Sequence, residues 1–159
     1  MRIGVIADTH IPDRAKEIPQ KICEDFKKVD LILHAGDLIE LKVLDEFKKI
    51  AEVKAVFGNM DSFSVVNSLP KKELIQIGKF KIGLIHGAGH PNRLMEVVRK
   101  EFDKVDCIVY GHAHNPVNEI KDGVLFFNPG SPTDKIFSAY NSYGILEIND
   151  TIKGEILKL

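Results

Sequence analysis

Hydrophobic positions in the first part of the chain alternate between strand-like and helix-like patterns. Continuous apolar runs at 2–7, 30–34 and 53–57 have the length of buried strands. Between them, apolar residues recur every three or four positions over 18–29 and 38–50, which predicts two amphipathic helices. Strands that are apolar throughout and alternate with helices indicate a largely parallel sheet covered on both faces.

After residue 61 the pattern changes. The segment 72–87 predicts two strands joined at Ile77-Gly78-Lys79, 92–102 predicts a helix, and 106–111 predicts another buried strand. The second part of the chain is therefore expected to carry fewer helices and more strands than the first.

Two hairpins are predicted to complete the chain. One turns at Asp122-Gly123, a pair favoured in tight β-turns, and the other turns near 149–153. No linker, repeat or low-complexity tract divides the sequence. We therefore expect a single α/β domain over 1–159, with two sheets face to face and helices outside.

Composition narrows the class of protein. The 159 residues are 44% hydrophobic and 28% charged, as in ordinary globular proteins, and the net charge of −1 gives no footprint for general nucleic-acid binding. No apolar run reaches the roughly 18 residues of a membrane span, and no basic and apolar leader precedes the first strand, so we expect a cytoplasmic protein. Cys23 and Cys107 lack CxxC spacing and are expected to be packed thiols.

Candidate metal ligands follow five of the apolar strands. Parallel strands bring the loops at their carboxyl ends to one edge of a sheet, so residues far apart in sequence can meet there. Glycine precedes three of these positions, at 36, 58 and 111, and we expect it to let the chain reverse toward the site. The ligand-type residues are Asp8, His10, Asp37, Asn59, His86, His112 and His114.

Simpler interpretations exist for individual members of this set. Asp8 and Asp37 could cap helices and Asn59 could be a turn residue. Caps and turns do not account for the histidines at 86, 112 and 114, so a joint site is the better explanation. A dinucleotide-binding loop is excluded, because no glycine fingerprint follows the first strand.

The ordered series DxH, GD, GNxD, H and GHxH resembles the signature of the calcineurin-like metallophosphoesterase superfamily. The resemblance covers roughly 1–131, and the short chain with GNMD at 58–61 is most similar to the compact phosphodiesterase branch. It implies a four-layer αββα sandwich of two mixed sheets flanked by helices. It also implies a phosphoric ester hydrolase with two metal ions.

The donor set limits which metals are expected. Carboxylate, amide and imidazole without thiolate suit Mn²⁺ or Ni²⁺, with Fe, Co²⁺ or Zn²⁺ as alternatives, rather than Cu(I), Mg²⁺ or Ca²⁺. Two such ions roughly 3.5 to 4 Å apart lower the pKa of a shared water and supply a bridging hydroxide that attacks the phosphodiester in line.

The resemblance implies how the ligands divide. Asp37 is expected to bridge the ions, one carboxylate oxygen to each, and Asp37, His86 and His112 are expected to take part in catalysis. The first metal is then held by Asp8, His10, Asp37 and His114, and the second by Asp37, Asn59, His86 and His112.

Met60 departs from the family pattern. Many members carry a histidine here, which protonates the leaving oxygen, whereas a thioether has no proton to give. The leaving group then departs unaided, or a metal-bound water, His90 or Asp61 supplies the proton. We therefore predict hydrolysis of phosphodiesters biased toward leaving groups of low pKa.

Two other functions fit the same residues. The same metals could serve a phosphomonoesterase, and a scaffold of the retromer-subunit type would use the fold for protein binding without hydrolysis. The substrate is expected to be a small phosphodiester, with nucleotides among the candidates, and a homo-oligomer is open. Phe63, Phe137, Tyr140 and Tyr143 are expected to divide between core and subunit interface.

Three further features border the predicted site. His34 is expected to be a packed histidine behind it, and His90 a surface histidine on a glycine-rich loop. Residues 128–131 (NPGS) are expected to form a turn near its rim.

Overall fold

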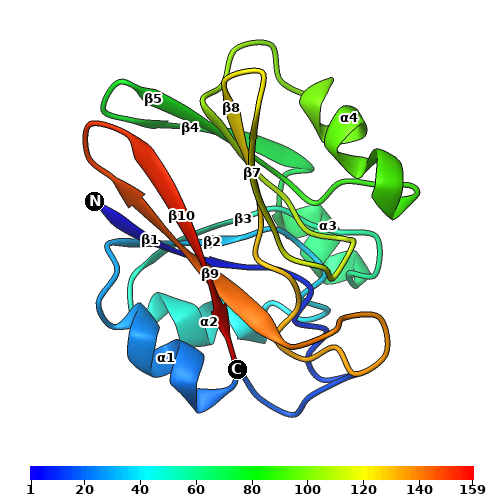
Figure 1. Cartoon of the computed structure of the whole chain (residues 1–159). Coiled ribbons are helices and arrows are strands. Elements are labelled where there is room, and N and C mark those ends of the chain that lie inside the picture. The colour runs from blue at the N-terminus through cyan, green and yellow to red at the C-terminus, as the bar shows by residue number, and fades with distance from the viewer.

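Two five-stranded sheets with helices on their outer faces make up the computed structural model, which describes all residues from Met1 to Leu159 (Figure 1). The first sheet has the order β10-β9-β1-β2-β3. Strands β1, β2 and β3 are parallel, β9 is antiparallel to β1, and β10 is antiparallel to β9. Its strands are β1 (Arg2–Ile6), β2 (Leu31–His34), β3 (Glu52–Ala55), β9 (Ser142–Ile148) and β10 (Ile152–Lys158).

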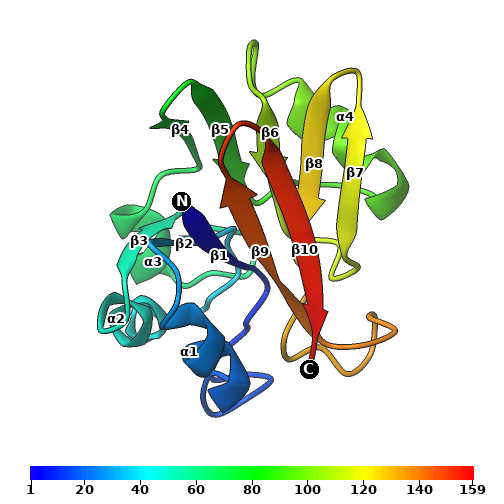
Figure 2. The same cartoon turned by 60° about the vertical axis from the view of Figure 1, so that its left-hand side comes forward.

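The second sheet has the order β4-β5-β6-β8-β7, with β5, β6 and β8 parallel to one another. Its strands are β4 (Lys72–Ile77), β5 (Phe80–Ile85), β6 (Cys107–Val109), β7 (Val117–Lys121) and β8 (Val124–Asn128). The helices are α1 (Gln20–Phe26), α2 (Lys42–Lys48), α3 (Phe63–Ser68) and α4 (Leu94–Arg99), with a 3₁₀ turn over Pro91–Arg93. Figure 2 shows α1 and α2 below the first sheet and α4 behind β7 and β8.

Alternate residues of the parallel strands enter different layers. Ile3 and Leu31 join the apolar layer between the two sheets, whereas Ile6 and Ile32 pack with Phe26 in the layer beneath α1 and α2. Each fully buried side chain of this size contributes about 1.5–3 kcal/mol to folding. Burial on both faces explains why these strands are apolar at every position. The predicted four-layer α/β sandwich with two mixed sheets is therefore confirmed.

Most predicted elements are present, with shorter bounds. The α2 helix begins at Lys42, so Leu38 and Leu41 precede it, and the helix predicted over 92–102 is a 3₁₀ turn followed by α4. The segment 62–69, for which the hydrophobic pattern predicts no helix or strand, contains α3. Only one residue of α3 is buried, which leaves no apolar periodicity for the sequence to reveal.

Both predicted hairpins form. β7 and β8 join at Asp122 and Gly123, which have φ of 50° and 78°, as a tight hairpin turn requires. Cys23 and Cys107 are free thiols, as expected. None of the helices has the length and apolar character needed to cross a membrane.

Candidate metal centre

The seven predicted ligands converge at one edge of the sandwich. They come from the loops after β1, β2, β3, β5 and β6, whose carboxyl ends meet where the two sheets face each other. The loop after β6 is joined to the loop after β1, because the backbone N–H of His112 donates to Asp8 Oδ2 at 2.9 Å. The convergence predicted from sequence is thus present in the fold.

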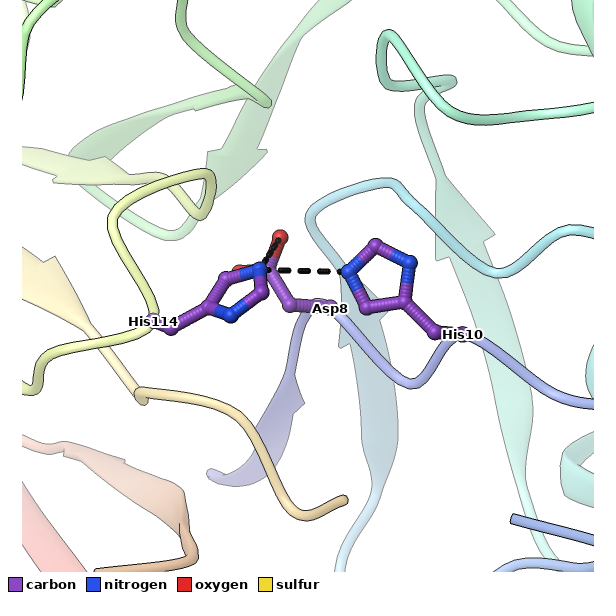
Figure 3. Close-up of side chains that lie close together, drawn as sticks. All are labelled: Asp8, His10 and His114. Carbon is purple, nitrogen blue, oxygen red and sulfur yellow. Dashed lines mark hydrogen bonds and ion pairs between the residues drawn. The ribbon is translucent and has the colours of Figure 1, made fainter. Parts of the chain in front are cut away.

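One half of the cluster is formed by Asp8, His10 and His114. Figure 3 shows the two imidazole rings facing each other from either side of Asp8. The Nε2 atoms of His10 and His114 are 3.1 Å apart, and His114 Nε2 is 3.5 Å from Asp8 Oδ1. All three side chains are buried, and their ligand atoms lie within 4.8 Å of one another.

The other half contains Asn59, His86 and His112. Asn59 Oδ1 is 3.1 Å from His86 Nε2 and 2.9 Å from His112 Nδ1. A cavity of about 210 Å³ borders this half, and Asn59 and His86 form part of its lining.

Asp37 lies between the two halves. Its Oδ2 is 3.3 Å from His86 Nε2 and 3.8 Å from His10 Nε2. Its Oδ1 accepts a hydrogen bond from the backbone N–H of Met60 at 2.8 Å. A single oxygen, Oδ2, therefore lies near histidines of both halves, and the division of the two oxygens between two ions stays a prediction.

Hydrogen bonds fix which ring nitrogen of three histidines faces the cluster. Carbonyl oxygens only accept, so His86 donates from Nδ1 to Ala35 O (2.7 Å) and His112 donates from Nε2 to Gly89 O (2.9 Å). His114 Nδ1 donates in the same way to Asp134 Oδ2 at 2.7 Å. The opposite nitrogen of each ring faces the cluster, where it would bind a metal ion once deprotonated, as in metal-binding histidines.

Backbone strain is concentrated at the same residues. Left-handed φ is uncommon outside glycine and gathers at functional sites. Only two other non-glycine residues, Ile39 and Asp122, have positive φ. The strained members of the cluster are Asp8 (53°), His10 (43°), Asp37 (57°), His112 (71°) and His114 (57°).

The role expected for the preceding glycines is only partly right. Gly36 has φ of 89°, but Gly58 and Gly111 do not have positive φ. They are required for space instead: a Cβ on Gly111 would lie 2.9 Å from Asp8 Oδ2, and one on Gly58 would overlap the Asp37 carboxylate. The positive φ values that turn the chain toward the site therefore belong mostly to the ligand residues themselves.

Burial leaves the negative charge of the cluster poorly compensated. Desolvation raises the pKa of Asp8 to about 8, although His86 opposes it. Burial acts to lower the pKa of His86, but hydrogen bonding to Asp37 and the charges of Asp8 and Asp37 outweigh it and raise that pKa to about 9. Burial lowers the pKa of His10 to about 4. Two buried carboxylates that only protons and His86 neutralise fit divalent cations, which would supply the positive charge instead.

Asp61 supports the site from behind. Its carboxylate accepts from the backbone N–H groups of Asp37 (3.0 Å), Ile39 (2.6 Å) and Gly58 (2.7 Å). These bonds tie the loop after β2 to the loop after β3. Because both oxygens are occupied as acceptors, the structure favours a positioning role for Asp61 over the proton-donor role considered from sequence.

The segment 128–131 fastens two ligand loops together. Asn128 Nδ2 donates to Gly111 O at 2.9 Å, and Ser131 Oγ donates to Asp8 O at 2.7 Å. Both residues are buried, so the segment is more than the rim turn expected from sequence.

The two remaining histidines behave as predicted. His34 is fully buried beneath the site, where Thr9 Oγ1 contacts its Nε2 at 3.2 Å, and burial lowers its pKa to about 3. His90 is exposed, and its Nδ1 accepts from the backbone N–H of Asn92 at the start of the 3₁₀ turn.

Sequence comparison identifies a family and several relatives of the chain. Residues 1–151 match the calcineurin-like phosphoesterase superfamily domain. A "probable metallophosphoesterase" of Methanocaldococcus jannaschii is 45% identical over 138 residues, which cover 84% of this chain and 69% of the relative. A phosphodiesterase of the same organism is 31% identical over 144 residues, which cover 82% and 83% of the two chains.

Structural comparison gives the same relationship. The zinc complex of Vps29 from Entamoeba histolytica superimposes with a TM-score of 0.78 and 30% identity, and the match covers 99% of each chain. Together with the match over 1–151, the fold and the Asp/His cluster, this likeness shows that the chain belongs to the calcineurin-like phosphoesterase superfamily.

Proposed function

We propose that the protein is a dinuclear-metal phosphodiesterase. The observation that carries the proposal is the placement of Asp37 Oδ2, which lies within hydrogen-bonding or ion-pairing distance of a histidine from each half of the cluster. Histidine and carboxylate ligands around two adjacent positions are the usual setting for metal-assisted hydrolysis of phosphate esters. The phosphodiesterase relative of M. jannaschii supports the diester over the monoester.

The residues divide into two ligand sets that share Asp37. The divalent ions, for which Mn²⁺ and Ni²⁺ are the leading candidates, would activate a water and neutralise charge on the phosphoryl group. We assign Asp8, His10, Asp37 and His114 to one ion, and Asp37, Asn59, His86 and His112 to the other.

The remaining contacts of the chain keep these ligands in place. The His112 amide holds Asp8, and the Met60 amide holds Asp37. The bonds from His86 to Ala35 O and from His112 to Gly89 O orient the two rings. Ligands fixed in advance need little reorganisation during the reaction, which is the main contribution that a protein makes at such a site.

Neither Met60, which replaces the family histidine, nor the neighbouring Asp61 is suited to protonate the leaving group. The Met60 side chain is 57% exposed at the rim and carries no proton, and Asp61 is occupied by backbone amides. His90 remains a candidate donor, because its Nδ1 accepts from Asn92 and its proton is therefore on Nε2. Esters with leaving groups of low pKa need least help from such a donor.

A non-catalytic scaffold is the second candidate, favoured by the likeness to Vps29. Exposed apolar side chains near the cluster, including Met60 and Phe63, would suit protein binding. The complete set of ligand residues favours the enzyme, since a scaffold does not need histidines and carboxylates arranged around two cation positions.

Turnover measurements test the proposal. Protein stripped with EDTA is loaded with Mn²⁺, Ni²⁺, Zn²⁺ or Mg²⁺ and offered aryl diesters, aryl monoesters and cyclic nucleotides. We expect metal-dependent hydrolysis with diesters preferred. Asp37→Ala should lower it at least about 10²-fold, because both metal positions lose a ligand. Asp103→Ala, at an exposed aspartate, is the matched control. Absence of turnover with every metal, or full activity of Asp37→Ala, would contradict the proposal.

A further inference from the structure

An aromatic side chain is held exposed next to the metal cluster. Phe137 lies in the loop between β8 and β9, and 63% of its surface is accessible. Its ring centroid is 6.0 Å from that of His114, in an edge-to-face arrangement. Figure 1 shows this orange loop at the same end of the molecule as the blue loop that follows β1. Single exposed apolar side chains are common on protein surfaces, and what distinguishes Phe137 is its contact with a ring of the metal cluster.

A buried carboxylate fixes the loop that carries Phe137. Asp134 is 3% exposed, and its two oxygens are fully used as acceptors. One bond reaches the cluster through His114 Nδ1 (2.7 Å), and another reaches the loop after β1 through Arg14 Nη1 (2.8 Å). The other donors are the backbone N–H groups of Ile136 (2.9 Å) and Phe137 (3.2 Å) and the hydroxyl of Ser138 (3.2 Å).

Arg14 lies beside Phe137, and we call these two side chains next to the cluster the rim. Its guanidinium carbon is 5.7 Å from the centroid of the Phe137 ring, and its side chain is 29% exposed. One Nη bonds to Asp134, and the guanidinium makes no other hydrogen bond within the protein. A pre-positioned cation with spare donors beside an exposed ring is an arrangement that binds flat aromatic groups through stacking and cation–π contact.

We propose that Phe137 and Arg14 form a subsite for a planar aromatic ester group, either an aryl ring or a nucleobase. The inference rests on the proposed function, since a phosphoryl group at the cluster is what brings its ester group to this rim. Of the two groups on a diester, the subsite takes one, on the side of Asp8, His10 and His114. Aromatic diesters, including nucleotide diesters, are therefore the favoured substrate class.

Binding of simple phosphates tests the subsite without turnover. Mn²⁺-loaded protein is titrated calorimetrically with methyl phosphate, phenyl phosphate and thymidine 5′-monophosphate. We expect the two aromatic compounds to bind on the order of 10-fold more tightly than methyl phosphate, the scale of one stacking contact. Phe137→Ala should abolish that preference, and Phe137→Tyr should retain it. Ile120→Ala, which removes another exposed apolar side chain on β7, should leave the preference as in the wild type.

The outcomes separate the subsite from the proposed function. Equal affinity of the wild type for all three phosphates overturns the subsite, whether or not the protein hydrolyses diesters. The subsite is also overturned if Phe137→Ala still prefers the aromatic phosphates. The same holds if the variant loses as much affinity for methyl phosphate as for the aromatic compounds, which would show a general disturbance of the site. If the protein prefers aromatic phosphates but hydrolyses no diester, the subsite is supported and only the proposed phosphodiesterase activity is contradicted.

Discussion

Asp134 acts on the cluster without being one of its predicted ligands. It accepts from His114 Nδ1 on one oxygen and from Arg14 on the other, at the centre of a loop that sequence patterns do not mark as functional. Burial acts to raise its pKa, but bonds from the Ile136 amide and His114 outweigh this and hold the pKa of Asp134 well below its usual value. The carboxylate is therefore charged at working pH. It orients the His114 ring and opposes the burial that lowers the pKa of that imidazole.

We predict that Asp134→Asn weakens metal binding about 10- to 100-fold, the range found when such a supporting carboxylate is lost. The amide has no charge, and it can accept from only one of the two flanking donors without turning its NH₂ toward the other. Titration of EDTA-treated protein with Mn²⁺, followed by electron paramagnetic resonance, measures the effect. Asp103→Asn is the matched control, and equal affinity in the two variants would contradict the role given to Asp134.

Met60 leads to a prediction about the chemical step. Without an acid at this position, the rate of aryl diester hydrolysis should fall steeply as the pKa of the leaving phenol rises. Met60→His should flatten this dependence and raise the rate for poor leaving groups by about 10²-fold, whereas Met60→Leu should leave the slope as it is. Rates measured over a series of phenols, under conditions where chemistry is limiting, provide the test. A flat profile in the wild type would show that a proton donor is already present.

At the scale of elements, short loops at strand ends decide the geometry of the site. Gly58, which follows β3, packs so closely on the loop after β2 that a Cβ would lie 2.7 Å from the backbone nitrogen of Asp37 and overlap its carboxylate. The Asp61 carboxylate also holds the two loops together, because it accepts hydrogen bonds from the backbone amides of Gly58 and Asp37. The two loops are therefore a single packed unit.

Gly58→Ala is expected to separate these loops. Overpacking of this kind typically costs about 1–3 kcal/mol of stability, and here it also displaces Asp37. We expect a lower Tm together with loss of Mn²⁺ binding. Gly78→Ala, in the open β4–β5 turn with φ of 55°, should show only the strain of about 1 kcal/mol and bind Mn²⁺ normally. Calorimetry and metal titration distinguish the two, and intact Mn²⁺ binding in Gly58→Ala would refute the packing argument.

Elements differ in how far the sequence could predict them. Strands buried on both faces contain continuous apolar runs, so the buried parts of β1, β2, β5 and β6, and the ligand residues after them, could be predicted from the hydrophobic pattern. The α3 helix buries only Val65 and leaves no such pattern. The supporting roles of Asp61 and Asp134 could not be predicted for a related reason. Asp61 accepts from backbone amides more than 20 positions away, and Asp134 accepts from the side chains of His114 and Arg14, so nothing local marks either aspartate as an acceptor for distant groups.

At the scale of the whole molecule, the sandwich buries several ionisable groups where its two sheets meet, and these groups make stability depend on pH. Desolvation raises the pKa of Asp8 to about 8, and the neighbouring carboxylates raise that of His86 to about 9 against the effect of burial. Burial lowers the pKa of His10 to about 4 and that of His34 to about 3. Each shift favours or disfavours folding over its own pH range.

The signs of these effects differ on either side of neutrality. Histidines with lowered pKa contribute stability above pH 6.5, and it is lost as pH falls through the values of His10 and His34. Groups with raised pKa contribute stability at low pH. For Asp8 it is lost as pH rises from 3.8 to about 8, and for His86 as pH rises from 6.5 to about 9. Below pH 6.5 the lowered pKa values of His10, His34 and His114 make stability increase with pH, against the decrease from Asp8 and Asp61. Above pH 6.5 only the decreasing contributions remain.

Metal-free protein should therefore be most stable near pH 6.5 and lose stability by about 1–3 kcal/mol per pH unit between pH 6.5 and 8. Divalent ions replace the protons on Asp8 and His86, so the rise in Tm on adding Mn²⁺ should be small at pH 6 and grow toward pH 8.5. Differential scanning calorimetry with EDTA or with excess Mn²⁺ measures both trends. Asp103→Asn should follow the wild type, whereas Asp8→Asn should lose most of the metal-dependent rise. A metal-induced shift in Tm that stays constant across this range would show that protons and metal ions do not compete for the cluster.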